Sequence, residues 1–228
     1  MVEERLKEAI KMIREDLKRE NELEYEGIGL TSLLYCPLKT EYKKRYPDLR
    51  NESITIDDGF LLERTFTPYL SRVFQGKVHA EPSITAVIKG HTITGHPDFV
   101  IEDKEITILE FKAPIMSFAK KQVEIPETDL FVDTQDVFSV SETYILQARI
   151  QKRLAREFYK KPVNAYLFIK TTVDINKKKQ KLYILKPIHE EATDEEIETL
   201  VKNFHENKRP RYEWECSYCP FRKVCEMP

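Results

Sequence analysis

The feature that most constrains the fold is a series of four short segments in the middle of the chain that are rich in β-branched residues. Turn-forming residues separate these segments, which span residues 84–88, 91–95, 98–102 and 105–112. Short runs of this kind, bounded by Gly, Pro and Asp, are typical of strands. The pattern therefore predicts an antiparallel meander.

Helices are predicted on both sides of the meander, because apolar residues recur there at helical spacing. The expected helices lie near the N-terminus, over residues 32–45, after a cap at Asp57 or Asp58, from Ser139 to Tyr159, and after Thr193. The last two begin with the spacing of capping boxes, Ser139 with Glu142 and Thr193 with Glu196. Two more strands are predicted over 163–172 and 181–187, so the order of elements predicts a mixed α/β domain. Residues 113–138 have no predicted element, which is typical of a lid or a binding loop.

Glu110 and Lys112 are the most informative charged residues of the meander. They lie two residues apart in a predicted strand, so their side chains share one face. The turn at Asp103 brings the segment that begins at Asp98 alongside, and two carboxylates and an amine then converge. A Glu-x-Lys triplet in a strand is ordinarily a solvent-facing pair. Here the neighbouring residues are apolar, which predicts burial, and a buried charged pair is costly without a function or a partner.

This constellation has the chemistry of a divalent metal site. Hard cations such as Mg²⁺ and Mn²⁺ prefer carboxylate oxygens, water and substrate phosphate. A metal held there lowers the pKa of its bound water and stabilises charge on a phosphate, and a nearby lysine can orient or deprotonate that water. The residues therefore favour metal-dependent phosphodiester chemistry.

The chain has four cysteines, of which three lie within ten residues near the C-terminus: Cys36, Cys216, Cys219 and Cys225. The highly charged first twenty residues predict no signal peptide, so two disulfides are the poorer explanation. Four thiolates can hold a structural zinc ion or an iron–sulfur cluster. Zinc ribbons commonly use two Cys-x2-Cys pairs, and this chain has one. The solitary Cys36 fits a cluster better, while zinc stays open as the alternative.

The charge balance excludes a histone-like or wholly cationic nucleic-acid binder, because 37 Lys and Arg against 39 Asp and Glu leave a net charge of −2. A local basic groove is not excluded. Basic clusters such as Lys152, Arg153 and Arg156 are candidates for a path along a phosphate backbone. Candidates for base stacking lie near basic residues at Tyr42, Tyr46, Phe118 and Tyr212. No apolar run approaches the ~20 residues that span a bilayer, and we expect a cytoplasmic protein that binds no membrane. The high Lys and Glu content hints at a thermophile.

The chain resembles the PD-(D/E)xK nucleases, because Pro97-Asp98 is followed by Glu110-Phe111-Lys112. One cysteine before this motif and three after it resemble the Cas4-type, RecB-like nucleases, over a span from Cys36 to Cys225. The resemblance implies a mixed central sheet with flanking helices and a C-terminal iron–sulfur clasp. It also implies metal-dependent DNA cleavage, commonly by exonuclease action on single-stranded ends.

The resemblance further implies roles for individual residues. Asp98, Glu110, Lys112 and Gln147 are the expected catalytic residues, with Mg²⁺ or Mn²⁺ held by Asp98 and Glu110. The four cysteines are the expected ligands of a [4Fe–4S] cluster. The expected organisation is one compact unit made of a helical segment over 1–50, a nuclease core over 51–207 and a cluster-binding tail over 208–228.

Two positions depart from the pattern of these nucleases. Their Gly-x3-His motif is here Gly59 followed by Glu63, and since a carboxylate can replace imidazole at a Mg²⁺ or Mn²⁺ site, Glu63 joins the expected metal ligands. Their Gln-x3-Tyr motif is here Gln147 followed by Gln151, which leaves its stacking or positioning role in doubt. His96 is expected to be a structural residue.

Three functions remain open on this basis. The first is a DNA nuclease of CRISPR spacer acquisition, with Cas1 and Cas2 as partners and single-stranded DNA as substrate. The second is a RecB-like nuclease of a virus or a repair system. The third is an iron–sulfur DNA-binding subunit without catalysis, which the Glu63 and Gln151 departures permit. An oligomer is compatible with all three.

Overall fold

The computed structural model describes residues 27–46, 49, 65–74, 77–112, 140–175, 178–206, 210–217 and 219–225. The predicted N-terminal helix, the cap at Asp57 or Asp58, Gly59, Glu63, Phe118 and the predicted lid all lie outside these residues.

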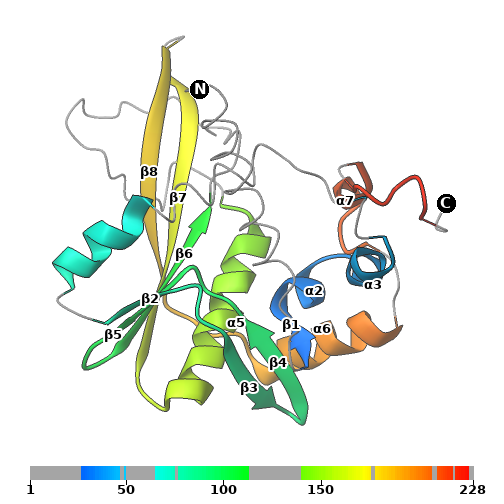
Figure 1. Ribbon diagram of the computed structural model, residues 1–228, viewed down its shortest axis with the longest axis horizontal. Coiled ribbons are helices and arrows are strands. Elements are labelled where there is room, and N and C mark those ends of the chain that lie inside the picture. The colour runs from blue at the N-terminus through cyan, green and yellow to red at the C-terminus, as the bar shows by residue number, and fades with distance from the viewer. Residues whose placement is uncertain are drawn as a thin grey trace, which may run out of the picture.

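A five-stranded mixed sheet forms the centre of the fold (Figure 1). Its strands, in spatial order, are β2 (Val78–Ala80), β5 (Phe99–Glu102), β6 (Ile106–Lys112), β7 (Val163–Ile175) and β8 (Lys178–Ile188). Only the β6–β7 pair is parallel. The mixed α/β class is therefore confirmed.

The predicted four-stranded meander is wrong in one respect, because its strands divide between two sheets. β3 (Ile84–Ile88) and β4 (His91–Gly95) pair antiparallel, and the short β1 (Ile28–Gly29) adds to β4 in parallel. β5 pairs instead with β2 and β6. The chain leaves the strand at residues 96–98, where Pro97 has no backbone N–H to continue a ladder.

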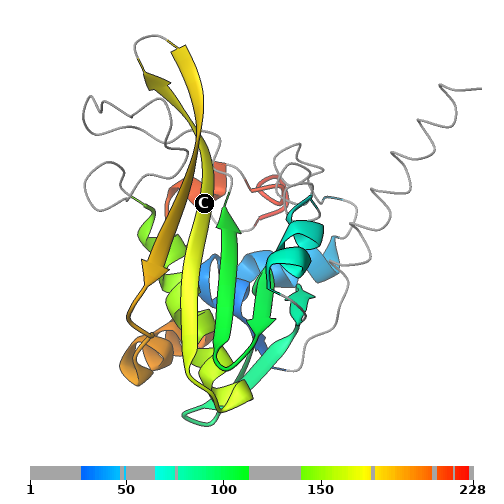
Figure 2. The same cartoon turned by 90° about the vertical axis from the view of Figure 1, so that its left-hand side faces the viewer.

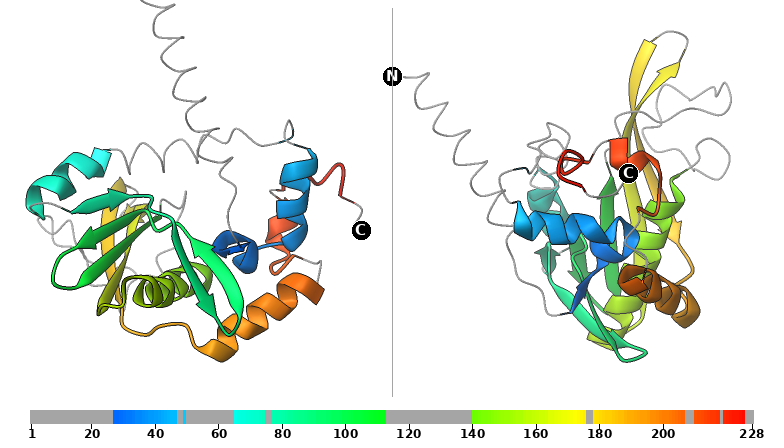
Figure 3. Two further views of the ribbon diagram at one scale, coloured as in Figure 1. Left: turned by 60° about the horizontal axis from the view of Figure 1, so that its bottom comes forward. Right: turned by 90° about the vertical axis from the view of Figure 1, so that its right-hand side faces the viewer.

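The two faces of the central sheet are covered by different helices (Figure 3). Ile106 and Ile108 of β6 pack into the core beneath α5 (Glu142–Tyr159), which lies between the central sheet and the β3–β4 hairpin. Phe111 points to the other face, where it packs with Phe66 of a helix that covers residues 65–73. Alternate residues of β6 thus face opposite layers.

The predicted helix over residues 32–45 is two helices, α2 (Leu30–Leu34) and α3 (Pro37–Arg45). Cys36, at their junction, has an extended ψ of 118°. A residue before proline is disfavoured in the helical region, whereas proline fits the first turn of a new helix. Pro37 therefore ends one helix and begins the next.

Of the two predicted capping boxes, one is confirmed. α6 (Asp194–Glu206) begins with hydrogen bonds from Thr193 N to Glu196 Oε2, at 2.8 Å, and from Glu196 N to Thr193 Oγ1, at 3.2 Å. α5 begins differently, because its N-cap is Ser141 and Glu142 is its first residue. Glu142 therefore cannot occupy the third helical position that a capping box requires.

The hairpin of β7 and β8 is longer than predicted. Its ladder continues to the pair Ile175 and Lys178, whereas the β6–β7 ladder ends at Lys112 and Ile169. The hairpin consequently extends past the end of β6 (Figure 2).

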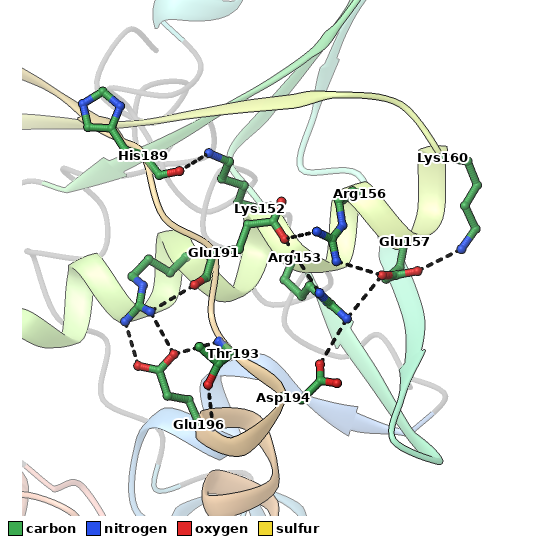
Figure 4. A network of polar contacts seen from close by, with 11 residues as sticks. Lys152, Arg153, Arg156, Glu157, Lys160, His189, Glu191, Thr193, Asp194 and Glu196 are labelled. Atoms are coloured by element: carbon green, nitrogen blue, oxygen red, sulfur yellow. Dashed lines mark hydrogen bonds and ion pairs between the residues drawn. The ribbon is translucent and has the colours of Figure 1, made fainter.

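Cations on α5 join this helix to the start of α6 and to the segment before it (Figure 4). Arg149 makes two 2.8 Å hydrogen bonds with the carboxylate of Glu196, and Arg156 lies 2.7 Å from Glu191. Arg153 pairs with Asp194 at 3.1 Å, and the Lys152 ammonium donates to two backbone carbonyls. The basic cluster on α5 thus makes ion pairs and hydrogen bonds within the chain, and its part in a DNA path stays a prediction. No helix among the described residues has the length and apolar character to cross a membrane.

Candidate functional site

Glu110 is a buried carboxylate in the central sheet. It lies in β6 on the face covered by α5, and only 1% of the residue is exposed. Its Oε1 accepts hydrogen bonds from the Lys112 ammonium and from Gln147 Nε2, the latter at 2.5 Å. Its Oε2 accepts one from Gln151 Nε2 at 2.7 Å. A carboxylate has about four acceptor positions, so these three donors hold Glu110 in one orientation.

Asp98 lies beside Glu110, directly before β5. Phe99, the next residue, pairs with Leu109 in the antiparallel ladder, which puts Asp98 next to Glu110 across the strands. The Asp98 Oδ2 accepts a hydrogen bond from the backbone N–H of Phe111. The predicted convergence of Asp98, Glu110 and Lys112 therefore occurs in the fold.

Lys112 is the cation of the site. Burial alone would lower the pKa of Lys112, but the charges of Glu110 and Asp98 outweigh it, and the net effect raises this pKa above the ordinary value. The ammonium also lies 5.6 Å from the centroid of the Tyr144 ring. Lys112 is thus held as a cation between carboxylates and an aromatic face.

Gln151 contacts Glu110 directly, which the motif of related nucleases did not predict. In the sequence, Gln151 stands where related nucleases have a tyrosine. In the structure, Gln151 is only 1% exposed, and its side-chain amide donates hydrogen bonds to Glu110 and, at 3.4 Å, to the backbone oxygen of His96. Its position four residues after Gln147 was the available signal, because residues at that spacing share one helix face. The two amides thus reach both oxygens of Glu110.

His96 lies in the segment between β4 and β5, two residues before Asp98. Burial lowers the pKa of His96, and a backbone hydrogen bond at Glu81 opposes the shift. The structural role expected for His96 stays a prediction.

The donor set at the site fits a hard divalent cation. Asp98 and Glu110 supply carboxylate oxygens, which Mg²⁺ and Mn²⁺ prefer, and such ions keep water and substrate phosphate as their remaining ligands. Within the described residues, no group of three or more His, Cys, Asp or Glu is arranged to hold a metal by itself. Water, substrate phosphate and side chains beyond the described ranges would supply the remaining ligands of a metal held by Asp98 and Glu110.

Cys36 lies at a contact between the N-terminal and C-terminal parts of the described chain. Cys36 N donates to Glu215 Oε2 at 2.7 Å, and Tyr42 packs near Phe221, with ring centroids 6.1 Å apart. Burial raises the pKa of the Cys36 thiol, and the nearby Cys219 contributes to this shift. All four thiols are free, and they do not form a ligand group as placed.

Aromatic residues join this contact to the Lys112 region. Trp214 of α7 (Trp214–Ser217) stacks on Tyr212 and meets the edge of Tyr35. Burial raises the pKa of Tyr35, against the opposing effect of the Lys112 ammonium. Tyr212 was a predicted base-stacking residue, whereas no local pattern distinguished Tyr35.

Known proteins share the fold and the family of this chain. The fold is similar to that of the protein SSO0001, with a TM-score of 0.64, 18% identity and 96% of both chains covered. A candidate exonuclease from Eubacterium rectale aligns with a TM-score of 0.40 and 12% identity, over 92% of this chain and 80% of its own. Comparison with curated protein sequences found no match. The family described as the PD-(D/E)XK nuclease superfamily matches residues 3–226. With a match that covers nearly its whole length, the chain belongs to the PD-(D/E)XK nuclease superfamily.

Proposed function

We propose that the chain is a metal-dependent DNA exonuclease that acts on single-stranded ends. Membership of the superfamily implies phosphodiester hydrolysis of DNA with Mg²⁺ or Mn²⁺. The observation that carries the proposal is the buried Glu110 carboxylate, fixed by Lys112 and two glutamines with Asp98 beside it. Two neighbouring carboxylates beside a lysine are the donor set that a divalent cation and a hydrolytic water require, which favours a catalytic role.

The residues divide the work of hydrolysis in this proposal. Asp98 and Glu110 hold the divalent cation, with Glu63 as a further proposed ligand outside the described residues. The cation supplies charge stabilisation at the phosphate and a water of lowered pKa. Lys112 orients the attacking water and donates to the phosphate, while Gln147 and Gln151 keep Glu110 in position.

The test is cleavage of end-labelled single-stranded and duplex oligonucleotides with Mn²⁺, and with EDTA in its place. Shortening of the single strand from one end, lost in EDTA and in Glu110→Gln, is the expected result. Glu190→Gln is the matched control, because the Glu190 side chain is 83% exposed. Cleavage that survives both EDTA and Glu110→Gln contradicts the assignment, and DNA binding without any cleavage favours the non-enzymatic subunit.

We infer a [4Fe–4S] cluster on Cys36, Cys216, Cys219 and Cys225 as a second part of the proposal. Its support is the donor set of four free thiols and the contact that brings the C-terminal tail to Cys36. This contact also favours treating residues 1–50, 51–207 and 208–228 as one unit. Anaerobically purified protein should carry about four iron and four sulfide per chain. Stoichiometric zinc in colourless protein contradicts the cluster.

The proposed biological setting is CRISPR spacer acquisition, and its support is the resemblance of the cysteine and nuclease motifs to Cas4-type proteins. Copurification with Cas1 and Cas2 from the native host tests this setting. Copurification with viral or repair proteins instead favours the second setting with unchanged chemistry.

A further inference from the structure

Tyr212 and Trp214 form an aromatic stack near the C-terminus of the described chain. Their ring centroids are 5.7 Å apart and their planes differ by 16°. Tyr35 meets Trp214 edge-on, at 6.3 Å and 77°. Trp214 is nevertheless 52% exposed, which is a large exposure for the single tryptophan of the chain. The stack thus offers an aromatic surface to a ligand.

The stack is held in place by polar contacts at its base. Glu215 is only 7% exposed, and its carboxylate accepts hydrogen bonds from Tyr212 N, at 2.9 Å, and from Cys36 N, at 2.7 Å. The Tyr212 hydroxyl accepts a 2.8 Å hydrogen bond from Thr143 Oγ1 at the start of α5. Three different parts of the chain therefore orient the rings, so the surface is formed before any ligand binds.

The stack lies next to the proposed catalytic residues. Thr143 is followed in α5 by Tyr144, whose ring lies 5.6 Å from the Lys112 ammonium. Tyr35, which contacts Trp214, also interacts electrostatically with Lys112. In Figure 1, α7 lies on the same side of the fold as α2 and α3. A DNA strand with a phosphate at Lys112 would therefore pass close to the stack.

The charge near the stack suits a nucleic acid. The Arg211 guanidinium lies 5.7 Å from the centroid of the Tyr212 ring, and Lys112 supplies a second cation on the side of the catalytic residues. Aromatic faces beside cations are the usual means of binding single strands, since every base has a π-face and every linkage a negative charge. Bases inside a duplex have both faces covered by their neighbours.

We propose that the Tyr212–Trp214 stack binds an unpaired nucleobase of the DNA strand whose phosphate lies at Lys112, and so selects single-stranded over fully paired ends. The proposal rests on the proposed nuclease function, because it assumes that DNA enters the site. The rings of Tyr212 and Trp214 would then account for the preference for single strands.

Trp214 fluorescence tests the proposal in the unmodified protein, because the chain has one tryptophan. The protein is titrated in EDTA, which prevents cleavage, with a thymine oligonucleotide and with an abasic oligonucleotide of equal length. We expect the thymine strand to quench the emission and the abasic strand to bind about tenfold more weakly with no quenching. Equal emission at saturating concentrations of both strands, or no binding of either, overturns the proposal.

Cleavage kinetics provide a second, independent readout. We expect Trp214→Ala to raise KM for single strands about tenfold with kcat changed less than twofold, and Trp214→Phe to keep most of the affinity. Phe158→Ala is the matched control, because Phe158 is 49% exposed and lies in the last turn of α5. An unchanged KM in Trp214→Ala would refute base binding by the stack but would not affect the proposed nuclease function. Fluorescence quenching in a protein that cleaves no DNA would instead overturn the nuclease function and support the stack.

Discussion

Gln151 donates a 2.7 Å hydrogen bond to the same Glu110 carboxylate that Gln147, one helical turn earlier, reaches at 2.5 Å. The two amides lie on one face of α5 and Glu110 lies in β6, so a helix positions the carboxylate of a strand. Although the sequence has Gln-x3-Gln in place of Gln-x3-Tyr, both glutamines donate to the Glu110 carboxylate.

Gln151→Met should reduce Mn²⁺-dependent cleavage about 10- to 100-fold, because residues that orient metal ligands typically contribute that much to metal affinity or activity. The substitution keeps the side-chain volume but removes the donor to Glu110. Cleavage rates over a range of Mn²⁺ concentrations measure the effect, and part of the loss should be recovered at high Mn²⁺. A variant with the wild-type Mn²⁺ dependence would show that Gln147 and Lys112 suffice.

Asp98→Ala and Glu110→Ala should each abolish cleavage, because each removes a proposed metal-binding carboxylate. Lys112→Ala should also abolish cleavage with little loss of metal affinity. Mn²⁺ binding measured by calorimetry separates the two classes of variant, and circular dichroism confirms that each has folded. Full cleavage by Glu110→Ala would refute the assignment of this site.

Glu215→Ala should lower the free energy of unfolding by about 2 kcal/mol, because it leaves the buried N–H groups of Cys36 and Tyr212 without their charged acceptor. The fluorescence of Trp214 should also change as its support loosens. Denaturant unfolding measures the first effect and the emission spectrum the second. Glu213→Ala, an exposed acid two residues earlier, should change neither. Equal unfolding free energies and equal emission spectra for Glu215→Ala and Glu213→Ala would contradict the hydrogen bonds of Glu215.

Glu196 should make the fold sensitive to acid. The backbone N–H of Thr193 and the Arg149 guanidinium lower the pKa of Glu196, so the folded chain binds this proton more weakly than the unfolded chain. Its stabilising effect is therefore present above the ordinary carboxyl pKa of about 4.3 and is lost as pH falls through the lowered pKa.

Glu196→Gln measures this effect. We expect it to cost about 1 kcal/mol at neutral pH and progressively less as pH falls below the ordinary carboxyl range. Melting temperatures across this pH range give the comparison. Glu206→Gln, at an exposed acid of the same helix, should cost little at any pH. A cost in Glu196→Gln that is equal at neutral and low pH would rule out the ionised contact.

Features set by neighbouring residues were determined by the sequence alone. Glu110 and Lys112 share a face because strand side chains alternate, and Thr193 caps α6 because the box spans only four residues. The motif of Asp98, Glu110 and Lys112 also identified the superfamily. These features depend on backbone geometry over a few residues and need no information on distant segments.

The tertiary structure alone decided which distant segments meet. The contacts from Gln151 to Glu110 and from Glu215 to Cys36 join residues 41 and 179 positions apart, and no periodicity encodes such separations. The burial of Glu110 depends on α5 covering its face of the sheet, and the split between β4 and β5 depends on where each strand finds a partner. Packing of apolar faces brings these segments together. The site therefore follows from the fold as a whole, while its chemistry was already present in the sequence.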